Sequence, residues 1–102
     1  MGRESLGMPE RRKLDDSEIT SRIADGNGWT LKDGKLLKRF EFESYKSGLV
    51  FAVAIGQQAD RVDHHPDIFI GYQYVEIGLN THDVGGISTY DFMLAEIIEG
   101  LV

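Results

Sequence analysis

All three histidines of this chain lie in one short part of the sequence, and they are its clearest candidates for chemistry. His64 and His65 are adjacent and precede Pro66, and His82 follows after an apolar stretch. Histidine can accept or release a proton at physiological pH because its ordinary pKa lies close to neutrality. Three histidines at the two ends of one strand-like passage therefore predict a site for acid/base catalysis.

Acidic residues near the histidines in the sequence are candidates for orienting them. Asp60 and Asp63 precede the histidine pair, and Asp91 follows His82. A carboxylate beside an imidazole favours one tautomer and changes its affinity for a proton. One histidine can then remove a proton from a small ligand while another protonates a leaving group, and each such group typically contributes about 10²–10⁴-fold to a rate. The sequence leaves open which histidine has which role.

Two other interpretations compete with acid/base catalysis. The histidines could be ordinary surface or structural residues, or three imidazoles could bind a metal ion. Adjacent side chains point to opposite sides of an extended backbone, so His64 and His65 do not share one face, and there is no His-x₃-His pair. The pattern therefore favours a site without metal. Acyl transfer, phosphoryl transfer and redox chemistry have no supporting motif.

The composition indicates one soluble domain. The 102 residues include 17 acidic and 11 basic side chains, which gives a net charge of −6. Nucleic-acid binding needs a basic surface, so we expect no nucleic-acid partner. No apolar run approaches the roughly 20 residues of a membrane span, and no signal peptide begins the chain. With no cysteine either, we expect a cytoplasmic protein without a membrane partner.

Helical and extended patterns alternate along the chain. Residues 1–13 lack apolar periodicity, so we expect a flexible tail, followed by a single domain from 14 to 102. The predicted elements are a helix capped by Asp15 and Glu18, strands over 29–32 and 35–42 joined by a hairpin turn at Asp33-Gly34, a helix over 44–62, strands over 68–72 and 74–82, and a helix capped by Ser88 and Asp91. Pro66 disfavours helical backbone at His65, which predicts that the middle helix ends near Asp63. His82 is predicted either on the face opposite Val75, Ile77 and Leu79 or just past the end of the last strand. The order α-β-β-α-β-β-α predicts an α+β fold with a four-stranded antiparallel sheet and three helices packed on one face.

The long helix that leads into the histidine pair has more apolar surface than one contact covers. Its residues follow helical spacing, in a stripe widened by further apolar positions: Tyr45, Leu49, Ala52, Val53, Gly56 and Ala59, with Val50, Phe51 and Ile55. We expect this helix to lie on the sheet with one flank free for another helix or a second subunit. A homodimer or homotetramer is the expected assembly.

Several of these residues together resemble the pterin-4a-carbinolamine dehydratase family. The matching elements recur in order with matching gaps: Asp60-x₃-His64-His65-Pro66, Tyr72, Thr81-His82, Gly86 and Ser88-x-x-Asp91, preceded by Gly28-Trp29, Gly34-Lys35-Leu36 and Phe40-x-Phe42. The resemblance extends from Leu14 to Ile98.

The resemblance implies a dehydratase that converts 4a-hydroxytetrahydropterin to quinonoid dihydropterin and water in tetrahydropterin recycling, with no metal or organic cofactor. It implies that His64, His65 and His82 are catalytic and that Asp60 and Asp91 support them. The substrate-binding residues that it implies are His64, His65, Pro66, Thr81, His82, Asp83 and Val84.

The chain departs from the family pattern at four positions. Asp60 is shorter than the Glu that is common there, Ile68 replaces a frequent Trp, Gln73 stands where Asn is common, and Tyr90 occupies a position that is often Arg. We expect lower efficiency from these departures and a retained activity. The alternative is a catalytically weak or inactive member that acts as a dimerisation or binding module, since mammalian members also stabilise a homeodomain transcription factor.

Overall fold

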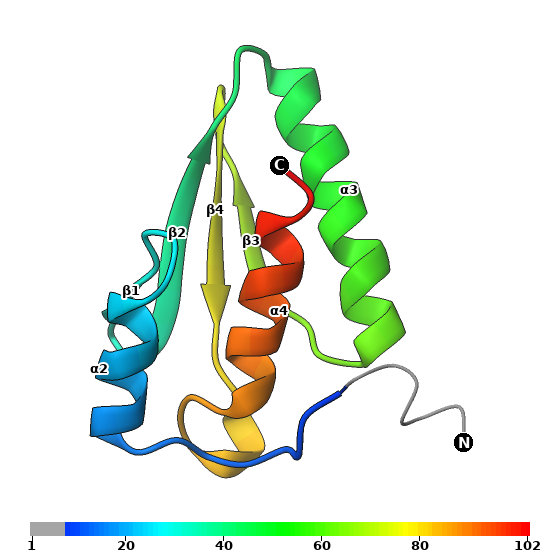
Figure 1. Ribbon diagram of the computed structural model, residues 1–102. Helices are drawn as coiled ribbons and strands as arrows, with labels where there is room; N and C mark the ends of the chain where they lie inside the picture. Colours follow the sequence, from blue (N-terminus) through cyan, green and yellow to red (C-terminus); the bar gives the residue numbers. More distant parts are fainter. Residues whose placement is uncertain (1–7) are drawn as a thin grey trace.

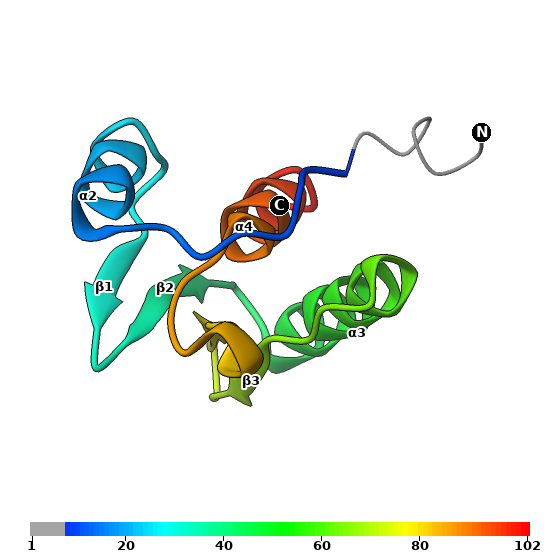
Figure 2. The ribbon, with the colours of Figure 1, turned by 90° about the horizontal axis from the view of Figure 1, so that it is seen from below.

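The computed structural model describes residues 8–102, and its elements follow the predicted order (Figure 1). The helices are α2 (Asp16–Ala24), α3 (Tyr45–Val62) and α4 (Thr89–Glu99), with a short 3₁₀ helix η1 (His82–Val84), and the strands are β1 (Thr30–Lys32), β2 (Lys35–Glu41), β3 (Asp67–Ile70) and β4 (Tyr74–Leu79). The strands form one antiparallel sheet in the order β1-β2-β4-β3. The three helices lie on one side of it (Figure 2), so the predicted α+β fold is confirmed.

The core lies between the helices and the two central strands. Alternate residues of a strand face the same side of a sheet, and in β2 and β4 these alternate residues are the buried ones. Leu36 pairs with Leu79, and Phe40 pairs with Val75. The helices complete this core with Ile19, Phe51, Ile55, Val62, Leu94 and Ile98.

The end of α3 fixes the position of the histidine pair. Asp63 has a φ of 54°, in the left-handed region, and its N–H donates to the carbonyls of Ala59 and Asp60. The His64 N–H also donates to the Ala59 carbonyl, at 3.1 Å. A left-handed residue reverses the chain direction at a helix end. The helix therefore ends immediately before His64, as the Pro66 signal predicts.

The predicted apolar stripe of α3 is wrong in part. Tyr45, Leu49 and Val53 are exposed at 49%, 37% and 65%, although the stripe placed them with buried residues. The face that packs on the core comprises Gly48, Phe51, Ala52, Ile55, Ala59 and Val62. A Cβ on Gly48 would lie 3.2 Å from Val75, so this glycine allows the helix to approach the sheet closely. Apolar spacing alone could not select the face, because apolar residues occur on several sides of this helix.

Part of the segment predicted as a tail makes ordered backbone contacts. Lys13 forms an antiparallel bridge with Ser88, and the Thr89 N–H donates to the Arg12 carbonyl at 3.0 Å. Residues 1–7, the rest of the predicted flexible tail, lie outside the described residues. Within residues 8–102, no helix has the length and apolar character needed to cross a membrane.

Candidate active site

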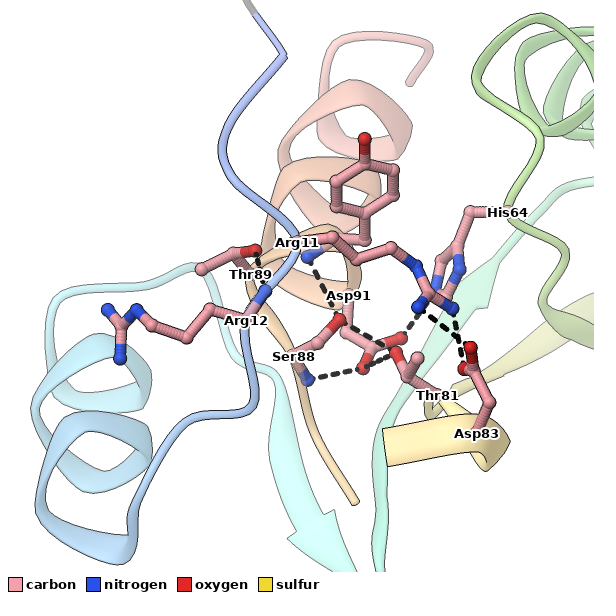
Figure 3. Close-up of polar contacts among 9 residues, drawn as sticks. Arg11, Arg12, His64, Thr81, Asp83, Ser88, Thr89 and Asp91 are labelled. Atoms are coloured by element: carbon pink, nitrogen blue, oxygen red, sulfur yellow. Dashed lines mark hydrogen bonds and ion pairs between the residues drawn. The ribbon is translucent and has the colours of Figure 1, made fainter. Parts of the chain in front are cut away.

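A buried hydrogen-bond network joins the end of α3 to the start of α4 (Figure 3). His64 is only 7% exposed, and its Nε2 lies 2.6 Å from Oδ1 of Asp91. The other carboxylate oxygen, Oδ2, accepts hydrogen bonds from the Thr81 hydroxyl at 2.8 Å and from the Ser88 N–H at 2.9 Å. Three segments that are distant in the sequence thus meet at the Asp91 side chain.

Asp91 is fully buried, and the start of α4 provides its partners. It is the third residue of the helix and forms a capping box with Ser88, as predicted. A buried carboxylate is costly unless it is hydrogen-bonded, and the positive end of the helix dipole favours an anion at this position. In residues 8–102 no buried side-chain nitrogen or oxygen lacks a hydrogen-bond partner. The carboxylate is therefore held in one orientation by the fold.

The orientation of Asp91 determines the tautomer of His64. An ionised carboxylate only accepts hydrogen bonds, so with Asp91 in that form His64 donates from Nε2 to its Oδ1. The other ring nitrogen, Nδ1, is then free of a proton in the neutral imidazole. The Tyr90 ring packs edge-on against the imidazole, with 5.8 Å between centroids. This arrangement leaves Nδ1 as the ring nitrogen that can accept a proton.

His65 lies in a different environment from its neighbour. Its Nε2 is 2.9 Å from Oδ1 of Asp60, and the two side chains are 58% and 81% exposed. One buried and one exposed ring agree with opposite directions along an extended backbone. Asp60 therefore contacts His65, while Asp91 contacts His64. Asp63, the third candidate partner, forms the left-handed end of α3.

His82 lies beyond the last strand, because β4 ends at Leu79 and the predicted strand over 74–82 is too long. The chain leaves the sheet and closes a small loop in which Thr81 and Gly86 exchange backbone hydrogen bonds of 2.8 and 3.3 Å. Gly85 has a φ of 73°, which glycine adopts without strain. His82 begins η1 and is exposed. Since Thr81 binds Asp91, the His82 backbone starts one residue from the network that holds His64.

The remaining predicted binding residues are Asp83 and Val84 in this loop and Pro66 before β3. Pro66 and Val84 are half-buried, and Asp83 is exposed. Asp83 accepts two hydrogen bonds from the Arg11 guanidinium, at 2.6 and 2.8 Å, and these bonds hold the pKa of the Asp83 carboxyl below its ordinary value. The sequence analysis missed Arg11, because a contact across 72 positions of the chain leaves no local pattern.

Among the predicted site residues, His64, Thr81 and Asp91 form one buried network, whereas Asp60, His65, His82 and Asp83 are exposed. A hollow of about 190 Å³ between α2 and α4 is lined by other residues, among them Arg22, Trp29, Phe92 and Glu99. In the part of the chain from Met8 onward, no three His, Asp or Glu side chains converge as a metal site would require. The arrangement offers imidazoles and carboxylates for proton transfer.

The structure defines a class of protein: an antiparallel α+β fold in which a buried carboxylate contacts a histidine between two helices. Comparison with known proteins identifies the family within that class. The family described as Pterin 4 alpha carbinolamine dehydratase matches residues 12–101. The chain belongs to this family, and the resemblance inferred from its histidine motifs is confirmed.

Individual relatives cover nearly the same region. A Roseiflexus castenholzii protein, provisionally named a pterin-4-alpha-carbinolamine dehydratase, is 38% identical over 89 residues, which are 87% of this chain and 96% of that protein. A Sulfolobus acidocaldarius protein with the same provisional name is 40% identical over 86 residues, or 84% of this chain and 94% of that protein.

Two solved structures share the fold. A transcriptional coactivator/pterin dehydratase from Brucella melitensis aligns with a TM-score of 0.82 and 26% identity, over 87% of this chain and 97% of that one. A pterin dehydratase-like protein identified as a RuBisCO assembly factor in the alpha-carboxysome aligns with a TM-score of 0.58 and 28% identity, over 72% and 84% of the two chains. The named roles of such relatives thus include catalysis and assembly.

Proposed function

We propose that this protein is a 4a-hydroxytetrahydropterin dehydratase that works by histidine acid/base catalysis. The single observation that best supports this proposal is the buried His64–Asp91 pair, which presents one oriented imidazole beside the segment of His82. Membership of the dehydratase family indicates the pterin class of substrate. No metal or organic cofactor is needed for the proposed reaction, because it transfers only protons and releases water.

The reaction requires two proton transfers. A base removes the proton from N5 of the pterin, and the electrons of that N–H bond form the double bond between N5 and C4a. The bond between C4a and the hydroxyl oxygen breaks, and an acid protonates the departing oxygen to give water. The product is quinonoid dihydropterin, and the protein ends with one proton moved from its acid to its base. Two imidazoles are suited to these roles, because each can change its protonation near neutral pH.

The difference in environment between the histidines suggests how the roles divide. Nδ1 of His64 is free to accept a proton, and the Asp91 carboxylate lies beside Nε2. When the ring accepts a proton, this carboxylate stabilises the positive charge of the ring. We assign the base to His64. His65 and His82 are exposed and can take up a proton from water between turnovers, so we assign the acid to one of them. In this proposal Asp60 supports His65, and Pro66, Thr81, Asp83 and Val84 border the pterin.

The proposal is tested by following the dehydration of synthetic 4a-hydroxytetrahydropterin spectrophotometrically. His82→Ala should abolish the enzymatic rate and leave the circular dichroism spectrum and thermal transition unchanged, because this exposed side chain contributes little to the core. Wild-type turnover in a folded His82→Ala variant would remove His82 from the mechanism. A wild-type protein that folds but does not accelerate the reaction would refute the proposed function.

A second candidate is a binding or dimerisation module with little or no turnover. The specific observation in its favour is the exposed apolar flank of α3, formed by Tyr45, Leu49, Val50 and Val53. The names of the two structural relatives, which include a coactivator and an assembly factor, point in the same direction. We infer a cytoplasmic homodimer or homotetramer for either function. Light scattering of the wild type and of Val53→Glu tests whether this flank mediates assembly, and the dehydration assay separates the two candidates.

A further inference from the structure

The segment before α2 lies against the loop that precedes α4. We call residues 10–14 the N-terminal strap. Arg12 exchanges hydrogen bonds with Thr89, its N–H donating to the Thr89 hydroxyl at 3.2 Å and its carbonyl accepting from the Thr89 N–H at 3.0 Å. The Thr89 hydroxyl also donates to the Glu10 carbonyl. These bonds hold the backbone of Glu10 and Arg12, on either side of Arg11, against the start of α4. Asp91 lies in the first turn of the same helix.

The Arg11 side chain extends from this strap across the candidate site (Figure 3). Its Nη1 and Nη2 donate to the two carboxylate oxygens of Asp83, at 2.8 and 2.6 Å. Its Cζ lies 5.8 Å from the centroid of the Tyr90 ring, the same ring that packs against His64. The guanidinium and the imidazole thus lie against one aromatic side chain. The family match begins at residue 12, so Arg11 precedes the matched region.

Arg11 joins the 3₁₀ helix η1 itself to a distant segment of the chain. Its backbone hydrogen bonds are local, from the Val84 N–H to the Thr81 carbonyl and from the Gly85 N–H to the His82 carbonyl. Among the hydrogen bonds of residues 8–102, only those between Arg11 and Asp83 connect a residue of η1 to a distant segment. A bidentate guanidinium–carboxylate pair fixes the relative orientation of the two groups as well as their distance.

We propose that Arg11 is a positioning residue for the dehydration reaction: by holding Asp83 it fixes η1, and so holds His82 beside the His64–Asp91 pair. This inference rests on the proposed function, since it assigns His82 a place in the reaction. It adds a residue from the N-terminal strap to a site otherwise built from residues 60 to 91. Misplacement of a catalytic group by about 1 Å can lower a rate by roughly 10²-fold, so an indirect contact of this kind matters.

The test compares two neighbouring arginines of the same strap. Arg11→Ala removes the pair with Asp83, whereas Arg12→Ala removes a similar pair with Glu18, at 3.1 and 3.0 Å, that joins the strap to α2. We expect kcat to fall by about tenfold in Arg11→Ala, with KM changed less than about twofold, and both to stay unchanged in Arg12→Ala. Arg11→Lys keeps the charge but cannot form the bidentate pair, so its kcat should lie between those of the wild type and Arg11→Ala.

The kinetic outcomes separate positioning from other roles. A rise in KM with kcat unchanged would indicate that Arg11 binds the pterin directly, and would overturn the positioning role. Equal losses in the two alanine variants would also overturn it, because they would point to a general weakening of the strap. Wild-type kinetics in Arg11→Ala would overturn it and leave the dehydratase function intact.

A second measurement keeps the inference testable if the wild type proves inactive. Amide hydrogen exchange of Val84 and Gly85, whose N–H groups make the local bonds of η1, should be about tenfold faster in Arg11→Ala than in the wild type or Arg12→Ala. Unchanged exchange would show that Arg11 does not hold η1. Faster exchange in an inactive protein would support the mechanical link while refuting the dehydratase function.

Discussion

The candidate site has two halves that are built differently. The buried half comprises His64, Asp91, Thr81 and Ser88, and the exposed half comprises His65, Asp60 and His82. Each half contains an imidazole next to a carboxylate, with nitrogen–oxygen distances of 2.6 Å for the buried pair and 2.9 Å for the exposed pair. The surroundings are what differ: the Asp91 carboxylate accepts two further hydrogen bonds inside the protein, whereas Asp60 is 81% exposed to water.

This difference separates orientation from accessibility. In the buried half the fold fixes the direction and tautomer of His64, so its geometry exists before any ligand arrives. Exposed ion pairs typically contribute only about 0.2–1 kcal/mol, so the pair between His65 and Asp60 constrains its histidine weakly. The exposed half exchanges protons freely with water instead. The proposed reaction uses both properties, a fixed base and an acid that is renewed from solvent.

The largest expected effect comes from changing the two carboxylates to amides. In Asp91→Asn the amide oxygen can still accept from Ser88 and Thr81, but its NH₂ then faces His64 Nε2, so the ring must carry its proton on Nδ1. By analogy with the serine-protease triad, where this exchange costs about 10⁴-fold, we expect a fall in kcat of roughly 10³–10⁴-fold. Asp60→Asn should cost about tenfold or less, because water can replace the exposed contact.

Steady-state kinetics with matched urea denaturation measures this contrast. Both variants should remain folded, since the amide retains the capping bond to Ser88 in the first and is exposed in the second. Similar losses of kcat in the two variants would mean that burial of the first carboxylate is not what orients the base. NMR of ¹⁵N-labelled histidine would show the exchange of tautomer at His64 directly.

The next largest effect is on stability, and it distinguishes the two adjacent histidines. His64→Ala leaves the buried Asp91 carboxylate without one of its donors and opens a space beside Tyr90, so we expect a loss of roughly 2–4 kcal/mol in the free energy of unfolding. His65→Ala removes an exposed side chain, and we expect a change within about 0.5 kcal/mol. Chemical denaturation of both variants measures the difference. Equal destabilisation would contradict the division of the site into a buried and an exposed half.

The sequence predicts those features of the fold and the site that depend on interactions between neighbouring residues. The capping boxes at Asp15 and Ser88 and the turn at Asp33-Gly34 were predicted correctly, because a few neighbouring residues determine them. Pro66 likewise indicates the end of α3. The four-stranded antiparallel sheet then follows from two hairpins packed under helices.

The wrong or missing predictions concern features that depend on contacts between residues far apart in the sequence. Apolar residues on several sides of α3 gave no means of choosing the face on which Phe51 and Ile55 pack. Alternation continued through His82, although Thr81 leaves the sheet to bind Asp91. Arg11 lies in a polar segment, and its partner Asp83 is 72 positions away. Spacing in the chain identified the histidines, but their division into buried and exposed halves depends on packing that the sequence pattern does not contain.

The smallest expected effect concerns pH and the link between the strap and η1. The hydrogen bonds from Arg11 are the main reason why the pKa of Asp83 lies below its ordinary value of 3.8. Because the folded-state pKa is the lower one, the stabilising contribution of Asp83 is fully present above about pH 4 and is lost as the pH falls through the folded pKa. Arg11→Ala should raise the pKa of Asp83 towards 3.8, and Arg12→Ala should leave it unchanged.

Carboxyl ¹³C chemical shifts followed between pH 2 and pH 7 measure this pKa in each variant. The protection of the η1 amides should decrease over the same acidic range in the wild type, and be low and independent of pH in Arg11→Ala. The hydrogen bonds of the network around Asp91 do not involve Asp83 or Arg11. If instead the pKa of Asp83 is the same in both alanine variants, another neighbour lowers it, and η1 is held by contacts other than Arg11.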